Sequence, residues 1–133
     1  MTYVTDTHAL IHRVTDHKRR LGRRARNVFD RVDRGSDTML VPFTVLEEVM
    51  LLSEIGKIHI PLPFREFVIS LAQADNIDLG VNDTAVLLEA ASFMSVRDPY
   101  DRMIIAQARV AGLPLITGDA RIQESGLVRT IWD

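Results

Sequence analysis

The chain has 133 residues, which fits one domain, and 47% of them are hydrophobic, which excludes a disordered chain. The absence of cysteine excludes disulfides and thiolate metal sites and leads us to expect a reducing, cytoplasmic location, and the net charge of −2 excludes a polycation. Asp6 and His8 interrupt the apolar opening, so we expect no signal peptide, and no apolar run approaches the length of a membrane span.

Short apolar runs alternate along the chain with longer stretches that have helical periodicity. The strands that we predict are Tyr3–Thr5, Met39–Val41, Ile77–Val81, Leu115–Thr117 and Arg129–Trp132. Strands that alternate with helices are typical of a mostly parallel sheet covered by helices on both faces. The sequence therefore predicts a single α/β domain over residues 1–133.

The segment His17–Arg34 carries a dense run of positive charge beside an apolar side formed by Val28, Phe29 and Val32. The basic residues that we single out are Lys18, Arg19, Arg20, Arg23 and Arg24. One interpretation is a solvated helix face. The other is a cationic surface that binds the phosphate backbone of RNA. The sequence leaves both interpretations open.

A helix is predicted to begin at Thr44, because Thr44 and Glu47 have the spacing of a capping box. In that motif Glu47 reaches back to the helix start, so its neighbour Glu48 remains free for other work. The helix is expected to end before Gly56, a residue type that commonly terminates helices.

Another helix is predicted to begin at Asp98-Pro99, with Asp98 as its N-cap and Pro99 in its first position. Asp101 then falls in the third helical position. The helix is expected to end at Gly112.

Four acidic residues stand where an α/β fold would bring them together, namely Asp6, Glu48, Asp101 and Asp119. Asp6 closes the first predicted strand and Asp119 follows the fourth. Carboxyl ends of strands and amino ends of helices meet at the same edge of a parallel sheet, where such folds bind ligands. Packed carboxylates stay ionised together only beside a cation, and ligation by oxygen alone suits Mg²⁺ or Mn²⁺. The pattern predicts a metal-dependent enzyme that acts on phosphate esters.

These acids would divide the work of phosphodiester hydrolysis between them. Asp6 and Asp101 are the expected direct metal ligands, while Glu48 and Asp119 would bind a second ion or orient metal-bound water. Thr117, two residues before Asp119, would hydrogen-bond this shell of ligands.

Each acid also has a purely structural explanation. Asp101 suits the positive end of a helix dipole, and Asp119 would cap a short helix over Ala120–Ser125. Glu48 would be an exposed helix residue. His8 and His12 invite a catalytic interpretation, but lone histidines are more often packing or turn residues. Asp6 is the hardest to explain in this way, because strands disfavour aspartate. The joint pattern favours a site over four independent structural accidents.

Four segments resemble the PIN domain and, more narrowly, VapC-type toxins of bacterial toxin–antitoxin pairs. They are Val4–Leu10, Glu47–Val49 ahead of Gly56–Ile58, Arg97–Ala108 and Gly112–Asp119. The resemblance implies a three-layer α/β/α sandwich and an endoribonuclease that depends on Mg²⁺ or Mn²⁺. It also implies a homodimer and a small antitoxin partner that blocks the site.

The acidic set of this family falls on the four residues singled out above. Asp98 and Thr117 match polar positions that accompany the set. The resemblance thus assigns catalytic and metal-binding roles to Asp6, Glu48, Asp101 and Asp119.

Three other functions fit the sequence less well than this one. A phosphatase of the haloacid dehalogenase type needs a second aspartate two residues after the first, and that position holds His8. No Gly-x-Gly-x-x-Gly motif follows the first strand, which disfavours a dinucleotide-binding enzyme. A non-catalytic RNA- or protein-binding module would have little use for four clustered acids.

Overall fold

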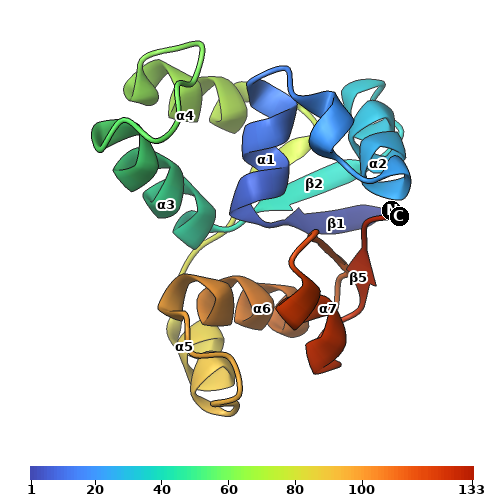
Figure 1. Ribbon diagram of the computed structural model, residues 1–133, viewed down its shortest axis with the longest axis vertical. Helices are drawn as coiled ribbons and strands as arrows, with labels where there is room; N and C mark the ends of the chain where they lie inside the picture. The colour runs from blue at the N-terminus through green and yellow to red at the C-terminus, as the bar shows by residue number, and fades with distance from the viewer.

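A computed structural model of the protein describes residues 1–133. Its elements alternate between strands and helices along the chain (Figure 1). The strands are β1 (Thr2–Thr5), β2 (Thr38–Val41), β3 (Ile77–Leu79), β4 (Leu115–Ile116) and β5 (Thr130–Ile131). The helices are α1 (Thr7–Val14), α2 (Arg23–Asp33), α3 (Phe43–Glu54), α4 (Phe64–Gln73), α5 (Thr84–Ala91), α6 (Pro99–Ala111) and α7 (Ala120–Ser125), with one 3₁₀ turn, η1 (Lys18–Arg20).

The five strands form one sheet in the order β3-β2-β1-β4-β5, and every neighbouring pair is parallel. All five predicted strands are therefore confirmed, although the third ends at Leu79 and the fifth spans only Thr130–Ile131. Parallel pairing requires a crossover between successive strands, and the helices supply it.

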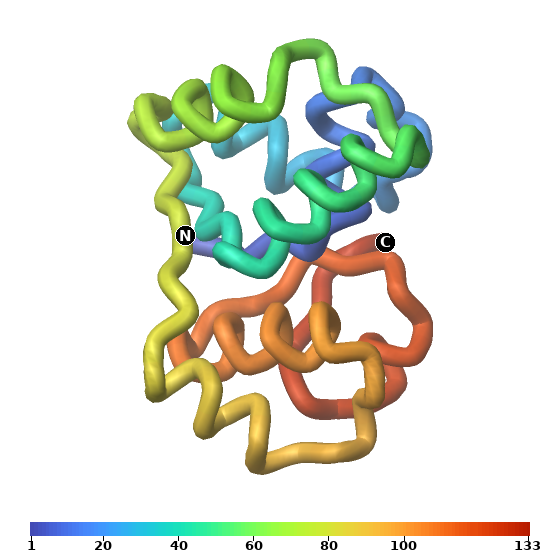
Figure 2. The backbone as a smooth tube through the Cα atoms, turned by 90° about the vertical axis from the view of Figure 1, so that its left-hand side faces the viewer, coloured from blue at the N-terminus to red at the C-terminus, as the bar shows by residue number.

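Helices cover the sheet on both faces, which confirms the three-layer α/β/α sandwich (Figures 1 and 2). Helices α1 to α4 lie on one side and α5 to α7 on the other, and the segment around β3 passes between the two sides (Figure 2). One cluster of 28 buried hydrophobic residues forms the core, and its centre includes Val4, Leu115 and Ile116. None of the helices has both the length and the apolar character that crossing a membrane requires.

The order of strands reverses direction at β1, which lies between β2 and β4. Val4 pairs with Leu115 and Thr5 with Ile116, so the residues that follow the two strands leave the sheet at the same level. The Asp6 N–H donates to the Ile116 carbonyl at 3.0 Å, which continues this pairing by one step. In open α/β sheets such a switch point leaves a crevice outside the carboxyl ends of the strands.

The predicted capping box at Thr44 and Glu47 is wrong. The N-cap of α3 is Pro42, two residues before Thr44, and the Pro42 carbonyl accepts from the Val45 N–H at 3.0 Å. Thr44 is buried inside the first turn, where its hydroxyl accepts from the Asn82 side-chain amide at 3.1 Å. The proline before the helix and this distant contact, rather than a local cap, determine the helix start.

The basic segment forms two separate elements instead of one continuous helix. The 3₁₀ turn η1 holds Lys18–Arg20, and α2 begins only after Gly22. Helix α2 buries Val28, Phe29 and Val32, as its amphipathic pattern predicts. The positive charges of the segment consequently lie on two elements that face different parts of the surface.

Candidate active site

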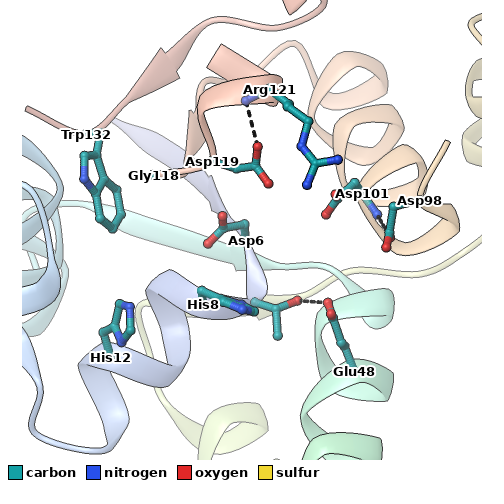
Figure 3. A pocket seen from close by; sticks show the side chains of 11 residues that line it. Asp6, His8, His12, Glu48, Asp98, Asp101, Gly118, Asp119, Arg121 and Trp132 are labelled. Carbon is teal, nitrogen blue, oxygen red and sulfur yellow. Dashed lines mark hydrogen bonds between the residues drawn. The ribbon is translucent and has the colours of Figure 1, made fainter. Parts of the chain in front are cut away.

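A pocket of about 450 Å³ opens at the switch point between β1 and β4 (Figure 3). Its 11 lining residues include the four acids predicted from the sequence, Asp6, Glu48, Asp101 and Asp119, together with Asp98. Folding thus brings carboxylates from four distant segments of the chain to one cavity. Thr117 lies fully buried in the loop that carries Asp119.

Asp6 lies deepest among these acids, with only 9% of its surface exposed. It follows β1 and is the N-cap of α1, where its Oδ1 accepts from the Ala9 N–H at 2.8 Å. Burial raises the pKa of Asp6, while the Thr117 hydroxyl, the Ala9 N–H and the charge of His8 oppose the shift. The bond to Ala9 fixes the carboxylate in one orientation.

Asp98 and Asp101 share the first turn of α6. Asp98 is the N-cap, as predicted, and accepts from the Asp101 N–H at 3.0 Å. Burial, followed by the negative charge of Asp98 and of the other pocket acids, raises the pKa of Asp101 to about 6. The surroundings of Asp101 therefore disfavour its ionised form.

Asp119 stands at the start of α7, after β4. Its Oδ1 accepts from the Arg121 N–H at 2.8 Å and from the Ile122 N–H at 3.3 Å, which confirms the predicted capping role. Its own N–H donates to the Thr117 hydroxyl at 3.1 Å. Since Asp119 also lines the pocket, the structural and functional interpretations of this residue are compatible.

Glu48 enters the pocket from the middle of α3, whereas Glu47 is not among the lining residues. The buried hydroxyl of Thr7 donates to Glu48 Oε1 at 2.5 Å. This bond links α3 to the first turn of α1 and orients the carboxylate. The sequence reasoning missed Thr7, although its place directly after Asp6 put it in the same turn.

The arrangement is suited to binding a cation through oxygen. The amino ends of α1 and α6 meet at the pocket, and their dipoles favour negative charge there. As the side chains stand, however, no three of the chain's acidic or imidazole groups are close enough to hold one metal ion together. The donor set matches the chemistry of a hard divalent ion, and the distances do not yet describe a coordination sphere.

A family model described as the PIN domain matches residues 3–126 of this chain. The chain belongs to the PIN domain family. No curated protein sequence matches it.

Solved structures of low sequence identity share the fold of this PIN domain. A chain of VapBC2 from Rickettsia felis, crystallised with a DNA fragment from the promoter, is similar with a TM-score of 0.70 at 14% identity over 100% of both chains. A toxin–antitoxin complex from Klebsiella pneumoniae gives 0.64 at 14% identity, over 97% of this chain and 95% of the other. VapBC-1 from nontypeable Haemophilus influenzae gives 0.65 at 13%, over 98% and 97%. These identities are low enough that the likeness concerns the fold alone.

Several other residues line the pocket of the PIN domain that the sequence did not single out as members of a site. They are His8, His12, Gly118, Arg121 and Trp132, in addition to Thr7. The guanidinium of Arg121 points into the space between Asp119 and Asp101 (Figure 3). No local pattern marks Trp132, because its place depends on the pairing of the last strand with β4.

A second depression adjoins the acidic pocket and shares His8 and His12 with it. All four histidines of the chain line this depression, together with Arg20 and Lys57. Arg24, from the same predicted basic set as Arg20, lines a different depression beside Met1. The basic residues therefore lie on two separate surfaces. Of the two arginines, Arg20 lines the depression that adjoins the acidic pocket.

The raised pKa of Asp101 has a consequence for the stability of the PIN domain. Because the folded-state pKa of about 6 exceeds the ordinary value of 3.8, the folded protein holds this proton more tightly than the unfolded chain does. The free energy of unfolding should therefore fall as pH rises from about 4 to about 6. A shift of this size corresponds to roughly 3 kcal/mol for a fully buried group, and solvent screening of this partly exposed side chain reduces it to about 1 kcal/mol.

Asp101→Asn should remove this penalty. In EDTA, urea unfolding should find the variant more stable than the parent by about 1 kcal/mol at pH 7.5, and equal to it near pH 4. An equal difference at both pH values would mean that the effect does not come from ionisation of Asp101.

Proposed function

We propose that this chain is a metal-dependent endoribonuclease that hydrolyses phosphodiester bonds in RNA and is the toxin of a toxin–antitoxin pair. One observation carries the proposal, namely the meeting of Asp6, Glu48, Asp101 and Asp119 in one pocket of a PIN domain. Asp6 and Asp119 also cap helices, but capping does not require four like charges around one cavity, and a divalent cation would relieve their repulsion. Their position at the switch point is also where this class of sheet binds ligands.

Mg²⁺ is the proposed metal, with Mn²⁺ as a substitute, because every candidate ligand is a carboxylate oxygen. Asp6 and Asp101 would hold the ion, and Glu48 and Asp119 would complete the acidic surroundings. The raised pKa of Asp101, caused by burial and by the neighbouring acids, supports the fit of a cation. When bound, such an ion neutralises phosphate charge and makes water a better nucleophile at neutral pH.

The protein itself keeps the acidic groups in place for this reaction. The Ala9 N–H orients Asp6, the Thr7 hydroxyl orients Glu48, and the N–H groups that open α7 orient Asp119. These bonds restrict the orientations that three of the four carboxylates can adopt before substrate arrives. The Arg121 guanidinium, which extends among the acids, is suited to contact a phosphate oxygen of the RNA.

Metal dependence provides the direct test. Purified protein should cleave total RNA in Mg²⁺ or Mn²⁺, and excess EDTA should stop cleavage because the acids alone repel the phosphodiester. Cleavage that persists in EDTA would exclude the proposed mechanism. RNA binding without cleavage in either metal would instead favour the non-catalytic binding module.

The depression beside the acidic pocket offers a path for the RNA backbone. Removing Arg20 should weaken binding of single-stranded RNA by about three- to tenfold at low salt and reduce its salt dependence, because a phosphate contact is lost. Arg24→Ala is the matched control, since Arg24 lies in the same basic run and lines a separate depression. Filter binding at several salt concentrations measures both variants. Equal losses in the two would indicate that the run acts only through its total charge.

An antitoxin partner and a homodimer belong to the same proposal. The three similar structures are VapBC or toxin–antitoxin complexes, which supports a small protein partner for this chain as well. Apolar side chains exposed on and beside α3 and α4, including Ile55 and Leu62, are available to a partner or a second copy. A small reading frame beside the gene would support the antitoxin. A toxin that cleaves RNA would act in the cytoplasm, in agreement with the absence of cysteine.

A further inference from the structure

A tryptophan stands in the wall of the acidic pocket. Trp132 is the chain's single tryptophan and the one hydrophobic residue among the 11 that line the cavity. It lies beyond residue 126, where the match to the PIN domain model ends. It reaches the carboxyl edge of the sheet because β5 pairs in parallel with β4. Its side chain lies across the pocket from Asp98 and Asp101 (Figure 3).

The indole ring rests directly on the backbone of Gly118. A Cβ atom at residue 118 would stand 2.7 Å from indole Cε2 and from Cζ2, and 3.1 Å from Cδ2. Only glycine at residue 118, directly before Asp119, therefore allows the indole ring to occupy this position. The ring is partly buried on this side, while another part of it lines the pocket.

The backbone of Trp132 is held as firmly as its ring. The Trp132 carbonyl accepts from the Ala25 N–H at 3.0 Å and so satisfies a donor at the amino end of α2. A Cβ at residue 22 would come within 2.2 Å of the same carbonyl oxygen. Because the ring and the backbone are both fixed, binding of a ligand to the indole costs little conformational entropy.

We propose that Trp132 is a substrate-binding residue whose indole stacks on a nucleobase next to the scissile phosphate of single-stranded RNA. This inference rests on the proposed ribonuclease function. A phosphodiester placed among the acids carries a nucleoside on each side, and a fixed aromatic ring at the wall offers a base an apolar face. Stacking accepts every base, since each has a π-face.

Single-stranded RNA fits this surface better than duplex RNA. In a duplex both faces of each internal base are already stacked, and bases stack on aromatic side chains mainly in single strands, loops and ends. The neighbouring depression, lined by Arg20 and Lys57, offers positive charge for the backbone beyond the stacked base. An aromatic platform beside a cationic groove is a common arrangement in proteins that bind single strands.

The indole can report on its own contact, because no other tryptophan contributes to the emission. A ten-nucleotide RNA of mixed sequence is titrated in Mg²⁺ into the Asp119→Asn protein. This substitution slows cleavage and keeps an N-cap residue at the start of α7. The single strand should quench tryptophan emission in step with binding. The same sequence as a blunt duplex should bind without comparable quenching. Binding of the single strand without quenching would overturn the inference.

Substitutions at residue 132 provide the second measurement. Trp132→Leu should weaken binding of labelled single-stranded RNA about tenfold, because the stacking contact is lost, while Trp132→Phe should retain most of the affinity. In the active protein, Trp132→Leu should raise KM and change kcat little. Parent-like RNA affinity in Trp132→Leu would overturn the inference.

Gly118→Ala tests the position of the ring while the indole remains present. The added methyl group must displace the ring, so affinity for the single strand should fall as in Trp132→Leu. Urea unfolding of each variant shows whether a loss of binding comes from a loss of folding. The emission titration is independent of this control, because it leaves residue 132 unchanged.

Two outcomes separate the stacking proposal from the proposed ribonuclease function. If Trp132→Leu cleaves RNA with the KM of the parent, the stacking proposal is wrong and the ribonuclease function is retained. If the parent protein binds single-stranded RNA with quenching of tryptophan emission but never cleaves it, the proposed ribonuclease function is wrong and the stacking proposal is retained.

Discussion

Asp6→Asn should lower the rate of RNA cleavage by about 10³-fold, because it removes the most deeply buried of the proposed ligands and with it several kcal/mol of stabilisation of the transition state. The rate is measured under single-turnover conditions in Mg²⁺ with a labelled RNA. Mn²⁺ binding, followed by calorimetry, should weaken in parallel.

The variant should remain folded, which separates chemistry from stability. Asparagine is as good an N-cap as aspartate, so the bond from the Ala9 N–H to residue 6 can persist. Burial raises the pKa of Asp6, which means that the fold disfavours its charged form. Replacing that charge with a neutral amide should therefore leave the free energy of unfolding at pH 7.5 in EDTA unchanged or slightly higher.

Asp78→Asn is the matched control for Asp6→Asn. Asp78 is an exposed aspartate in β3, at the edge of the sheet, and it does not line the acidic pocket. The control should cleave RNA at the parent rate. Parent-like activity of Asp6→Asn would remove Asp6 from the mechanism, and an equal loss in both variants would point to net charge as the cause.

Gly22→Ala should reduce the stability of the protein by about 3 kcal/mol, or about 10 °C in Tm. The backbone of Gly22 has φ −59° and ψ 158°, which alanine adopts without strain. The cost comes from contact, because a Cβ at this position would lie 2.2 Å from the Trp132 carbonyl oxygen. The C-terminal segment must then move away from α2 and lose its bond to the Ala25 N–H, which stands at 3.0 Å.

Gly80→Ala offers a graded comparison. Its Cβ would meet the side-chain oxygen of Gln107 at 2.9 Å and the Pro42 Cα at 3.2 Å, and a side-chain amide can move aside. Its cost should stay below about 1 kcal/mol by urea unfolding. Equal losses in the two variants would show that the approach of Trp132 to Gly22 is less tight than the structure gives.

Local signals carried much of the prediction of the fold. Five short, mostly apolar runs predicted five strands, because the central strands of a parallel sheet are buried on both faces. Asp98-Pro99 predicted the start of α6, since capping and the fixed φ of proline act within one turn. The same logic failed at Thr44, whose hydroxyl bonds to Asn82, 38 residues away. A local pattern cannot reveal a competing partner that is distant in sequence.

The candidate acids were accessible from sequence for a related reason. Parallel strands place their carboxyl ends at one edge, so Asp6 and Asp119 were expected on the same edge of the sheet, and the pairing of β1 with β4 brings the two strand ends together. Glu48 was preferred to Glu47 because of a capping box that the structure does not form, and only the fold shows that Glu48 lines the pocket and Glu47 does not. Helix phase depends on where the helix begins and on what it packs against.

The amino-acid sequence by itself determined the parallel α/β architecture and the four candidate acids, because apolar runs, helix caps and the alternation of strands with helices are patterns along the chain. The tertiary structure alone decided the rest of the pocket wall. Thr7 bonds to Glu48 across 41 residues, and Trp132 lies on Gly118 because the last strand joins the sheet beside β4. Contacts of this kind arise from the packing of whole elements, and no short stretch of sequence encodes them.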